Sequence, residues 1–400
     1  MRLLVAISHH GLGHLAQAAP VLNALHATRP DLEFLVWSGV PHAALAARIH
    51  APFQHRHEPA DVGLAMHDAV RVDLAASTSA YLAFHQDWDA RVADEAAWLR
   101  DQGIGGVLSD VACLPLAAAA QAGIPGVAMC SLNWVDIAGA YLAEQPGMAT
   151  VLEQLEAAYR SARVFLRVLP AMPMDWLEKR EAVPPIAALG VDRRVELRAR
   201  LELEQGERLV LLGFGGIAYK PFAGPPQERL ASLGGLLGRF SQAGGTDIQA
   251  ARPLPALNGV RWLVPDDWCQ ERGDLIPFSR GGLAFLDLLA SCDALVTKVG
   301  YGSFVEAAAA GIPVLYIDRP DWPETPYLRD WLLAHTRAAV IDEAGLFDPE
   351  VGVLLATLLA APRMPRVALD GAAVAAQRVL ELLGFATLNP SYDPRFLRGS

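Results

Sequence analysis

Short apolar runs alternate with amphipathic stretches along the first 130 residues of the chain. Short apolar runs that end at glycine, serine or cysteine predict buried strands, whereas apolar residues spaced three or four apart predict helices. We expect strands at 3–7, 32–38, 106–109 and 125–130. We expect helices at 14–28, 41–48 and 114–122. This alternation predicts a mostly parallel sheet that is covered by helices on both faces.

A longer helical pattern covers residues 80–100, between the second and third predicted strands. Tyr81, Phe84, Trp88, Val92 and Trp98 follow one another mostly at spacings of three or four residues. This spacing places them on one face of a helix. We therefore expect one long helical stretch in this region.

The second half of the chain repeats the alternation after a proline-rich stretch at 172–189, where the periodicity lapses. A helical segment at 192–201 precedes predicted strands at 209–212, 260–264, 294–297 and 314–317. A last amphipathic helix is expected at 371–383. We therefore predict a first domain at 1–180, a linker at 181–206, a second domain at 207–370, and a C-terminal helix and tail at 371–400.

Size and composition agree with this division, because 400 residues are enough for two or three domains. The chain is 52% hydrophobic with a mean hydropathy of +0.24. No run approaches the ~20 apolar residues that span a bilayer, so we expect no transmembrane segment, and peripheral contact with a membrane stays open. We also expect no signal peptide. The four cysteines are widely separated, which favours free thiols in the cytoplasm.

The charge of the chain limits its partners. The formal net charge is −11 and no basic run occurs. We therefore expect no nucleic-acid partner, because such proteins carry basic patches. An anionic ligand would be held by local dipoles and a few cations rather than by a general positive field.

Two glycine-punctuated turns follow predicted strands almost 300 residues apart. The first is SHHGLGH at 8–14, and the second is GYGSFVE at 300–306. Each leads into a helix, so each can present backbone N–H groups and a positive helix end to an anion or a sugar. The pair predicts two facing domains with a ligand between them.

Four segments of the chain resemble nucleotide-sugar glycosyltransferases of the GT-B fold. They are GH at 13–14, LSD at 108–110, LLGFGG at 211–216, and DALVTKVGYGSFVEA at 293–307 followed by GIP at 311–313. The last block resembles the donor-binding segment of peptidoglycan N-acetylglucosaminyl, plant galactolipid and antibiotic glycosyltransferases. The resemblance implies an α/β protein with two Rossmann-like, doubly wound parallel-sheet domains that face a cleft.

The resemblance also implies where a nucleotide-sugar donor binds. The diphosphate would rest on the turn and helix at 300–306, and Glu306 would accept hydrogen bonds from the ribose. Asp321 and Glu324 would read sugar hydroxyls, although both also suit a solvated loop, and the glycines also suit a plain turn. The expected donor-binding residues are Gly13, Gly215, Gly216, Lys298, Gly300, Gly302, Ser303, Phe304, Glu306, Asp321 and Glu324.

His14 and Asp110 are the candidate catalytic residues. An acceptor hydroxyl must lose its proton as it attacks the anomeric carbon, and a histidine with a pKa near neutrality suits that step. The resemblance matches His14 to the catalytic histidine and Asp110 to the aspartate that orients it. His9 and His10 remain alternative bases at this point.

Other motifs argue against a metal and against retention of configuration. The DxD at 87–89 falls inside a helical pattern, and no further ligand cluster accompanies His10 and His14. We therefore expect no metal. Where the two-glutamate motif of retaining enzymes would place its first glutamate, eight residues before Glu306, this chain has Lys298. This difference favours inversion.

The sequence thus predicts a cytoplasmic, metal-independent, inverting glycosyltransferase that moves a hexosyl or N-acetylhexosaminyl group from a nucleotide-diphosphate sugar, most simply a UDP-sugar, to an acceptor hydroxyl on a small molecule or lipid. Two alternatives stay open. A nucleotide-sugar 2-epimerase shares the fold and the donor loops but needs no acceptor. A catalytically silent nucleotide-sugar-binding protein would share them as well.

Overall fold

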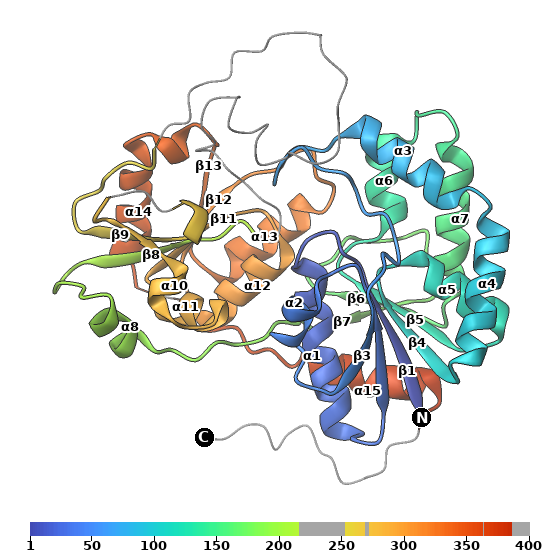
Figure 1. Ribbon diagram of the computed structural model, residues 1–400. Helices are drawn as coiled ribbons and strands as arrows, with labels where there is room; N and C mark the ends of the chain where they lie inside the picture. The colour runs from blue at the N-terminus through green and yellow to red at the C-terminus, as the bar shows by residue number, and fades with distance from the viewer. Residues whose placement is uncertain (216–252, 269–271, 363, 386–400) are drawn as a thin grey trace.

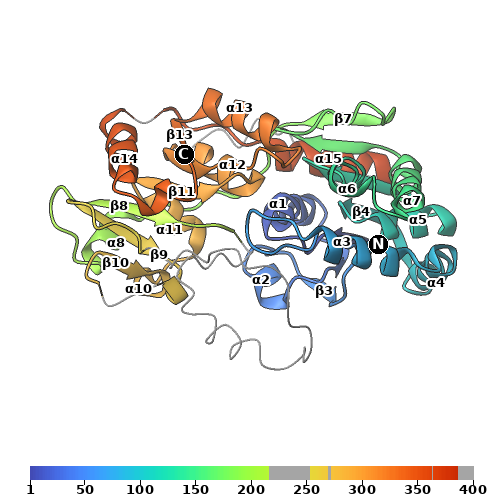
Figure 2. The same ribbon diagram turned by 90° about the horizontal axis from the view of Figure 1, so that it is seen from above.

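The computed structural model describes residues 1–215, 253–268, 272–362 and 364–385, and it contains two α/β units that lie side by side (Figures 1 and 2). Each unit has one sheet in which all neighbouring strands run parallel. The predicted α/β class with two doubly wound parallel-sheet domains is therefore confirmed.

The first sheet has seven strands in the order β3-β2-β1-β4-β5-β6-β7. The strands are β1 (Arg2–Ile7), β2 (Glu33–Trp37), β3 (Phe53–Arg56), β4 (Ile104–Asp110), β5 (Gly126–Cys130), β6 (Phe165–Val168) and β7 (Arg180–Val183). The order reverses on either side of β1, so the loops after β1 and β4 diverge at the carboxyl ends of these central strands. A ligand-binding crevice forms at such a point in open parallel sheets.

Helices cover both faces of the first sheet. They are α1 (Gly13–Thr28), α2 (His42–Ala46), α3 (Leu74–His85), α4 (Trp88–Asp101), α5 (Cys113–Ala122), α6 (Trp134–Leu142), α7 (Met148–Ser161) and α15 (Gly371–Leu383). Along β1, Leu3 and Val5 belong to one buried cluster and Leu4 to another, because successive side chains of a strand point to opposite faces. Burial on both faces explains why β1 is apolar throughout.

The second sheet has six strands in the order β10-β9-β8-β11-β12-β13. The strands are β8 (Arg208–Leu212), β9 (Val260–Val264), β10 (Leu275–Pro277), β11 (Ala294–Lys298), β12 (Val314–Ile317) and β13 (Ala338–Ile341). The helices of this part are α8 (Arg194–Arg200), α10 (Phe278–Gly281), α11 (Phe285–Ser291), α12 (Tyr301–Ala310), α13 (Thr325–His335) and α14 (Glu350–Ala360). Short 3-10 helices span Asp266–Trp268 and Gly345–Phe347.

The predicted continuous helical stretch at 80–100 is wrong, because the chain breaks between α3 and α4. Asp87 adopts a left-handed conformation with a φ of 54°, which no helix interior accommodates. The His85 ring stacks on Trp88 across the break, with the ring centroids 4.5 Å apart. The aromatic spacing that predicted one helix therefore belongs to two helices that share a core.

The linker region and the C-terminal helix both add to the first unit. β7 extends the first sheet to Val183, into the range predicted as linker. The C-terminal helix α15 crosses back and packs against α1 and β4 of the first unit (Figures 1 and 2). No helix within the described ranges is long and apolar enough to cross a membrane.

Candidate functional site

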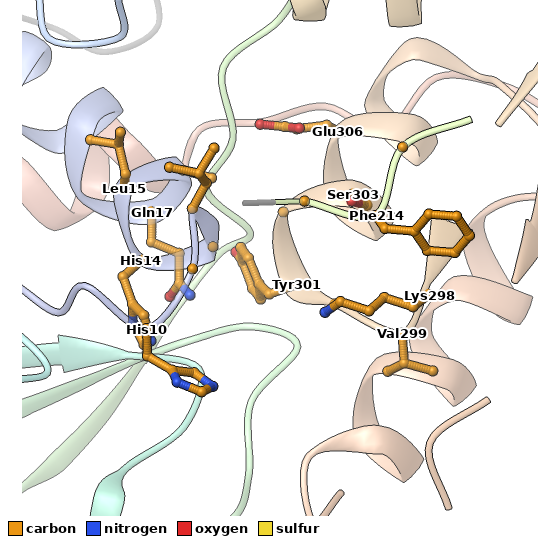
Figure 3. A pocket seen from close by; sticks show the side chains of 18 of the residues that line it. His10, His14, Leu15, Gln17, Phe214, Lys298, Val299, Tyr301, Ser303 and Glu306 are labelled. Atoms are coloured by element: carbon orange, nitrogen blue, oxygen red, sulfur yellow. The ribbon is translucent and has the colours of Figure 1, made fainter. Parts of the chain in front are cut away.

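A cavity of about 430 Å³ lies between the two units, at the carboxyl ends of their central strands. Figure 3 shows His10 and His14 on one side of it, and Lys298, Ser303 and Glu306 on the other. The predicted site residues that line the cavity are Gly13, His14, Gly215, Lys298, Gly300, Gly302, Ser303, Glu306 and Glu324. The structure thus brings together residues that are almost 300 positions apart in the sequence.

Three predicted residues do not line this cavity, and one cannot be placed. Phe304 is fully buried and packs edge-on against Tyr316 in the core of the second unit. Asp321 is exposed, and the Tyr141 hydroxyl donates to its carboxylate at 2.8 Å. Asp110 lies behind His14. Gly216 falls outside the described residues.

His14 and Asp110 form a buried hydrogen-bonded pair. His14 is the second residue of α1, and Asp110 ends β4, which pairs with β1 in the sheet. His14 Nδ1 lies 3.0 Å from Asp110 Oδ1, and both side chains are at most 5% exposed. Because the carboxylate accepts the Nδ1 proton, Nε2 is left with a free lone pair. The pair therefore has the arrangement of a histidine base held by a carboxylate.

The pKa of His14 reflects this partner. Burial alone would lower the pKa, but the hydrogen bond and the negative charge of Asp110 outweigh burial, so the pKa of His14 is raised above 6.5. Asp61 and Glu324 add to the negative potential at the ring. The site thus stabilises the imidazolium that forms when His14 takes up a proton.

His10 lacks these properties of a base. The backbone N–H of Leu64 donates to His10 Nδ1 at 3.3 Å, which leaves the ring proton on Nε2. The ring lies parallel to Trp322, 5.9 Å away, and edge-on to Trp134. Burial, reinforced by the charges of His14 and Lys298, lowers the pKa of His10 to about 3, so this ring stays neutral.

His9 lies at the edge of the site rather than in it. Its side chain is 34% exposed, and its Nδ1 is 3.4 Å from Asp61 Oδ1. Asp61 also accepts a hydrogen bond from the Trp134 indole at 2.8 Å. His9 does not line the cavity, so the geometry favours His14 over both neighbouring histidines.

Within the described residues, one group of side chains has the spacing to gather around a metal ion. His14, Asp110 and Cys130 each offer a ligand atom within 4.8 Å of the others, and all three are buried. Cys130 Sγ lies 3.6 Å from His14 Nδ1. The hydrogen bond between His14 and Asp110 already uses the atoms that would face an ion, so we interpret the group as a hydrogen-bonded cluster.

The start of α12 approaches the start of α1 across the cavity. A Cβ added to Gly302 would lie 3.2 Å from the Ala16 Cβ, which is tighter than ordinary packing. Gly300, Gly302 and Ser303 all line the cavity, and α12 runs for ten residues behind them. The positive end of this helix therefore faces the cavity, where it favours an anion.

Glu306 is engaged by a residue that the sequence reasoning missed. Arg48, just after α2, donates to Glu306 Oε1 at 2.6 Å, which links the two units. Burial raises the pKa of Glu306, and the charge and hydrogen bond of Arg48 oppose that rise. Arg48 and Glu306 are 258 residues apart, so no local pattern indicates their contact.

Glu324 takes part in a second link between the units. The Ser131 hydroxyl donates to Glu324 Oε1 at 2.6 Å, and the Trp322 indole donates to Oε2 at 3.3 Å. Gln17 in turn donates to the Ser131 hydroxyl at 3.1 Å. This chain of hydrogen bonds joins α1 to the loop after β12, beside His14.

Lys298 and Arg319 are cations at the same end of the cavity. Lys298 ends β11, and it pairs in register with Ile317, the last residue of β12, two residues before Arg319. The Arg319 guanidinium lies 4.3 Å from the centre of the Trp322 ring. Burial, together with the charge of Arg319, lowers the pKa of Lys298 to about 7. Arg319 is a second cavity residue that the sequence reasoning missed.

No family model matches the chain. Among curated proteins, L-arabinokinase from Arabidopsis thaliana is 25% identical over 329 residues. The match covers 82% of this chain and 29% of that protein, so this chain spans less than a third of the length of the relative.

Solved structures resemble the whole chain at low sequence identity. The spinosyn forosaminyltransferase SpnP has a TM-score of 0.53 at 16% identity, over 96% of this chain and 95% of that one. The glycosyltransferase of kitacinnamycin has a TM-score of 0.55 at 14% identity, over 96% and 94%. A UDP-N-acetylglucosamine 2-epimerase has a TM-score of 0.50 at 12% identity, over 98% of both chains. At this identity the likeness establishes the fold, and the chain has the GT-B fold.

Proposed function

We propose that this chain is an inverting glycosyltransferase that moves a hexosyl or N-acetylhexosaminyl group from a nucleotide-diphosphate sugar to an acceptor hydroxyl. The observation that carries the proposal is the buried His14–Asp110 pair, which faces the start of α12 across one cavity. A base on one wall and an anion-binding helix end on the other are the two parts that such a transfer needs.

The donor is held by the second unit in this proposal. The diphosphate rests on the backbone at Gly300, Gly302 and Ser303, where the positive end of α12 stabilises the negative charge that grows as the nucleotide leaves. Because this helix supplies the stabilisation, the reaction needs no metal. The nucleotide in this proposal is UDP, because the structurally similar epimerase is named for a UDP-sugar, UDP-N-acetylglucosamine.

The acceptor binds on the side of His14. Nε2 of His14 takes the proton of the attacking hydroxyl while Asp110 stabilises the imidazolium. The hydroxyl oxygen forms a bond to the anomeric carbon as the bond from that carbon to the diphosphate breaks. Since base and leaving group occupy opposite walls of the cavity, attack opposite the leaving group inverts the anomeric centre.

A cytoplasmic location is part of the proposal. Cys113 and Cys130 are free and buried, which suits a reducing compartment.

The experiment follows UDP-sugars with and without a panel of hydroxyl acceptors. Release of UDP that depends on an acceptor, unchanged by EDTA, supports the transferase. Interconversion of the sugar without acceptor identifies the 2-epimerase, and binding with neither reaction identifies a nucleotide-sugar-binding protein. UDP at a hundred times its dissociation constant should stabilise the fold by about 2.7 kcal/mol. If no nucleoside diphosphate or nucleotide sugar raises the melting temperature, the donor assignment is wrong.

A further inference from the structure

Two cations beside His10 and Trp322 have no anionic partner among the described residues. Lys298 forms no ion pair with any described residue, and Nε and Nη2 of Arg319 are buried without a hydrogen-bond partner there. Arg319 is only 4% exposed. An unpartnered buried charge is costly, so its presence in a cavity indicates that a ligand supplies the counter-charge.

The carboxylates around these two cations have other partners. Glu324 lies on the same loop as Arg319, but its two oxygens accept hydrogen bonds from Ser131 and Trp322. Asp321 likewise accepts a hydrogen bond from Tyr141, and Asp68 is paired with Arg71. These carboxylates act on Arg319 from a distance, and among the described residues none of them forms an ion pair with Lys298 or Arg319.

The position of the cations separates them from the proposed diphosphate site. In Figure 3 the Lys298 side chain extends toward the side of the cavity that holds His10 and His14, whereas Ser303 and Glu306 lie at the other end. Arg319 contacts Trp322, which in turn stacks on His10. The cations therefore lie beside the base, where the transferred sugar must be held for its anomeric carbon to react.

Both cations also come from the unit that holds the donor in the proposed function. Lys298 ends β11 and Arg319 follows the neighbouring strand β12, and both line the cavity, whereas His14 comes from the other unit. A planar guanidinium binds a carboxylate through two parallel hydrogen bonds, and an ammonium adds a compact charge.

We propose, building on the function proposed above, that Lys298 and Arg319 form a carboxylate subsite for the donor sugar, which is then a hexuronic acid rather than a neutral hexose. The carboxylate at C6 of the sugar lies between the two cations, and the Trp322 ring packs against the apolar face of Arg319. Specificity for an acidic sugar thus comes from two cations that form no ion pair with any described residue.

The test is calorimetric titration of the full chain with UDP, UDP-glucose and UDP-glucuronic acid. We expect the wild type to bind UDP-glucuronic acid about 10- to 100-fold more tightly than UDP-glucose, the range of a charge-assisted hydrogen bond. Arg319→Gln and Lys298→Met should each reduce this preference strongly and leave the affinity for UDP within about threefold of the wild type. Arg329→Gln, which removes an exposed arginine of α13, is the matched control and should change nothing.

Folding of the variants is checked by their melting temperatures. Removing an unpartnered buried charge removes its desolvation cost, so Arg319→Gln without ligand should melt no lower than the wild type. Lys298→Met serves as the second, independent variant of the same subsite.

Three results would overturn the inference, each in a different way. Equal affinity of the wild type for the two UDP-sugars would show that the cations do not bind the sugar. An equal loss of affinity for all three ligands in the variants would assign the cations to the diphosphate. Free glucuronate that binds the UDP complex in an Arg319-dependent manner, with no preference between the UDP-sugars, would place the carboxylate on the acceptor. Absence of UDP binding would instead contradict the proposed function, and the inference with it.

Discussion

The two ring nitrogens of His14 have different partners, and this difference determines what the residue can do. Nδ1 is held by Asp110 at 3.0 Å, while Nε2 belongs to a ring that lines the cavity. His10 has the opposite arrangement, because its Nδ1 accepts a hydrogen bond from the backbone of Leu64. His14 is therefore poised to accept a proton at Nε2, whereas neutral His10 can only donate a hydrogen bond from its Nε2–H.

The pH dependence of the reaction follows from the pKa of His14. A protonated imidazole cannot accept the acceptor's proton, so kcat/KM should fall as the pH drops through that pKa. Because Asp110 raises the pKa, the midpoint of this acid limb should lie above 6.5. Asp110→Asn should move the midpoint to lower pH and also slow turnover, as measured in a pH–rate profile.

The matched control for this profile is Asp330→Asn, which neutralises an exposed acid on α13. We expect it to leave the acid limb where it is. A limb that stays in place in Asp110→Asn would show that another group controls the rate.

Individual residues differ in how far the sequence could predict them. Asp110 ends the buried strand β4, and His14 lies at the start of the helix that follows the neighbouring strand β1, so their meeting at the carboxyl edge of the sheet could be expected from the chain alone. Arg48 and Arg319 carry no such local signal, because their roles arise only when two units pack together. Phe304 sits in the predicted donor block but on the face of α12 that packs into the core.

At the scale of elements, an ion pair between the units joins the residue just after α2 to α12. Arg48→Met would leave Glu306 buried without its cation, which costs about 3 kcal/mol, the low end for breaking a buried pair. We expect the melting temperature to fall accordingly. Glu306→Gln should restore most of the loss in the double variant, because a neutral amide is easier to bury than a carboxylate.

Chemical denaturation of the four proteins in this double-mutant cycle measures the coupling between the two side chains. A matched exposed pair is Arg160 with Glu156 on α7, for which we expect a coupling below about 1 kcal/mol. Additive effects of Arg48→Met and Glu306→Gln would contradict the proposed link.

Strands, like individual residues, differ in how far the sequence could predict them. The central strands β1, β5, β8 and β11 are apolar because helices cover both faces, and all four were predicted. The edge strands β3 and β7, with sequences FQHR and REAV, are half exposed and lack an apolar run. Their existence depends on pairing with a neighbouring strand, which no local pattern encodes.

At the scale of the whole molecule, the fit between α1 and α12 sets how closely the units approach. Gly302→Val would place a branched side chain against Ala16, where even a Cβ lies at 3.2 Å. We expect this variant to hold the units apart, to increase the radius of gyration in small-angle scattering, and to weaken nucleotide binding.

Gly273→Val is the matched control, because Gly273 is exposed and a Cβ there meets no described residue within 4 Å. It should leave both the scattering and the affinity unchanged. Unaltered dimensions and affinity in Gly302→Val would show that the units do not depend on this contact.

The central claim is that His14 is the base and Asp110 its partner, and turnover of the His14→Ala variant tests it most directly. We expect a loss of about 10²- to 10⁴-fold in acceptor-dependent UDP release, or in donor hydrolysis by water, with UDP affinity nearly unchanged. Adding Asp110→Asn should cost little more, because the two residues act as a unit. His26→Ala, on the same helix, is the matched control. Wild-type turnover in His14→Ala, with activity abolished in His9→Ala or His10→Ala, would contradict the claim.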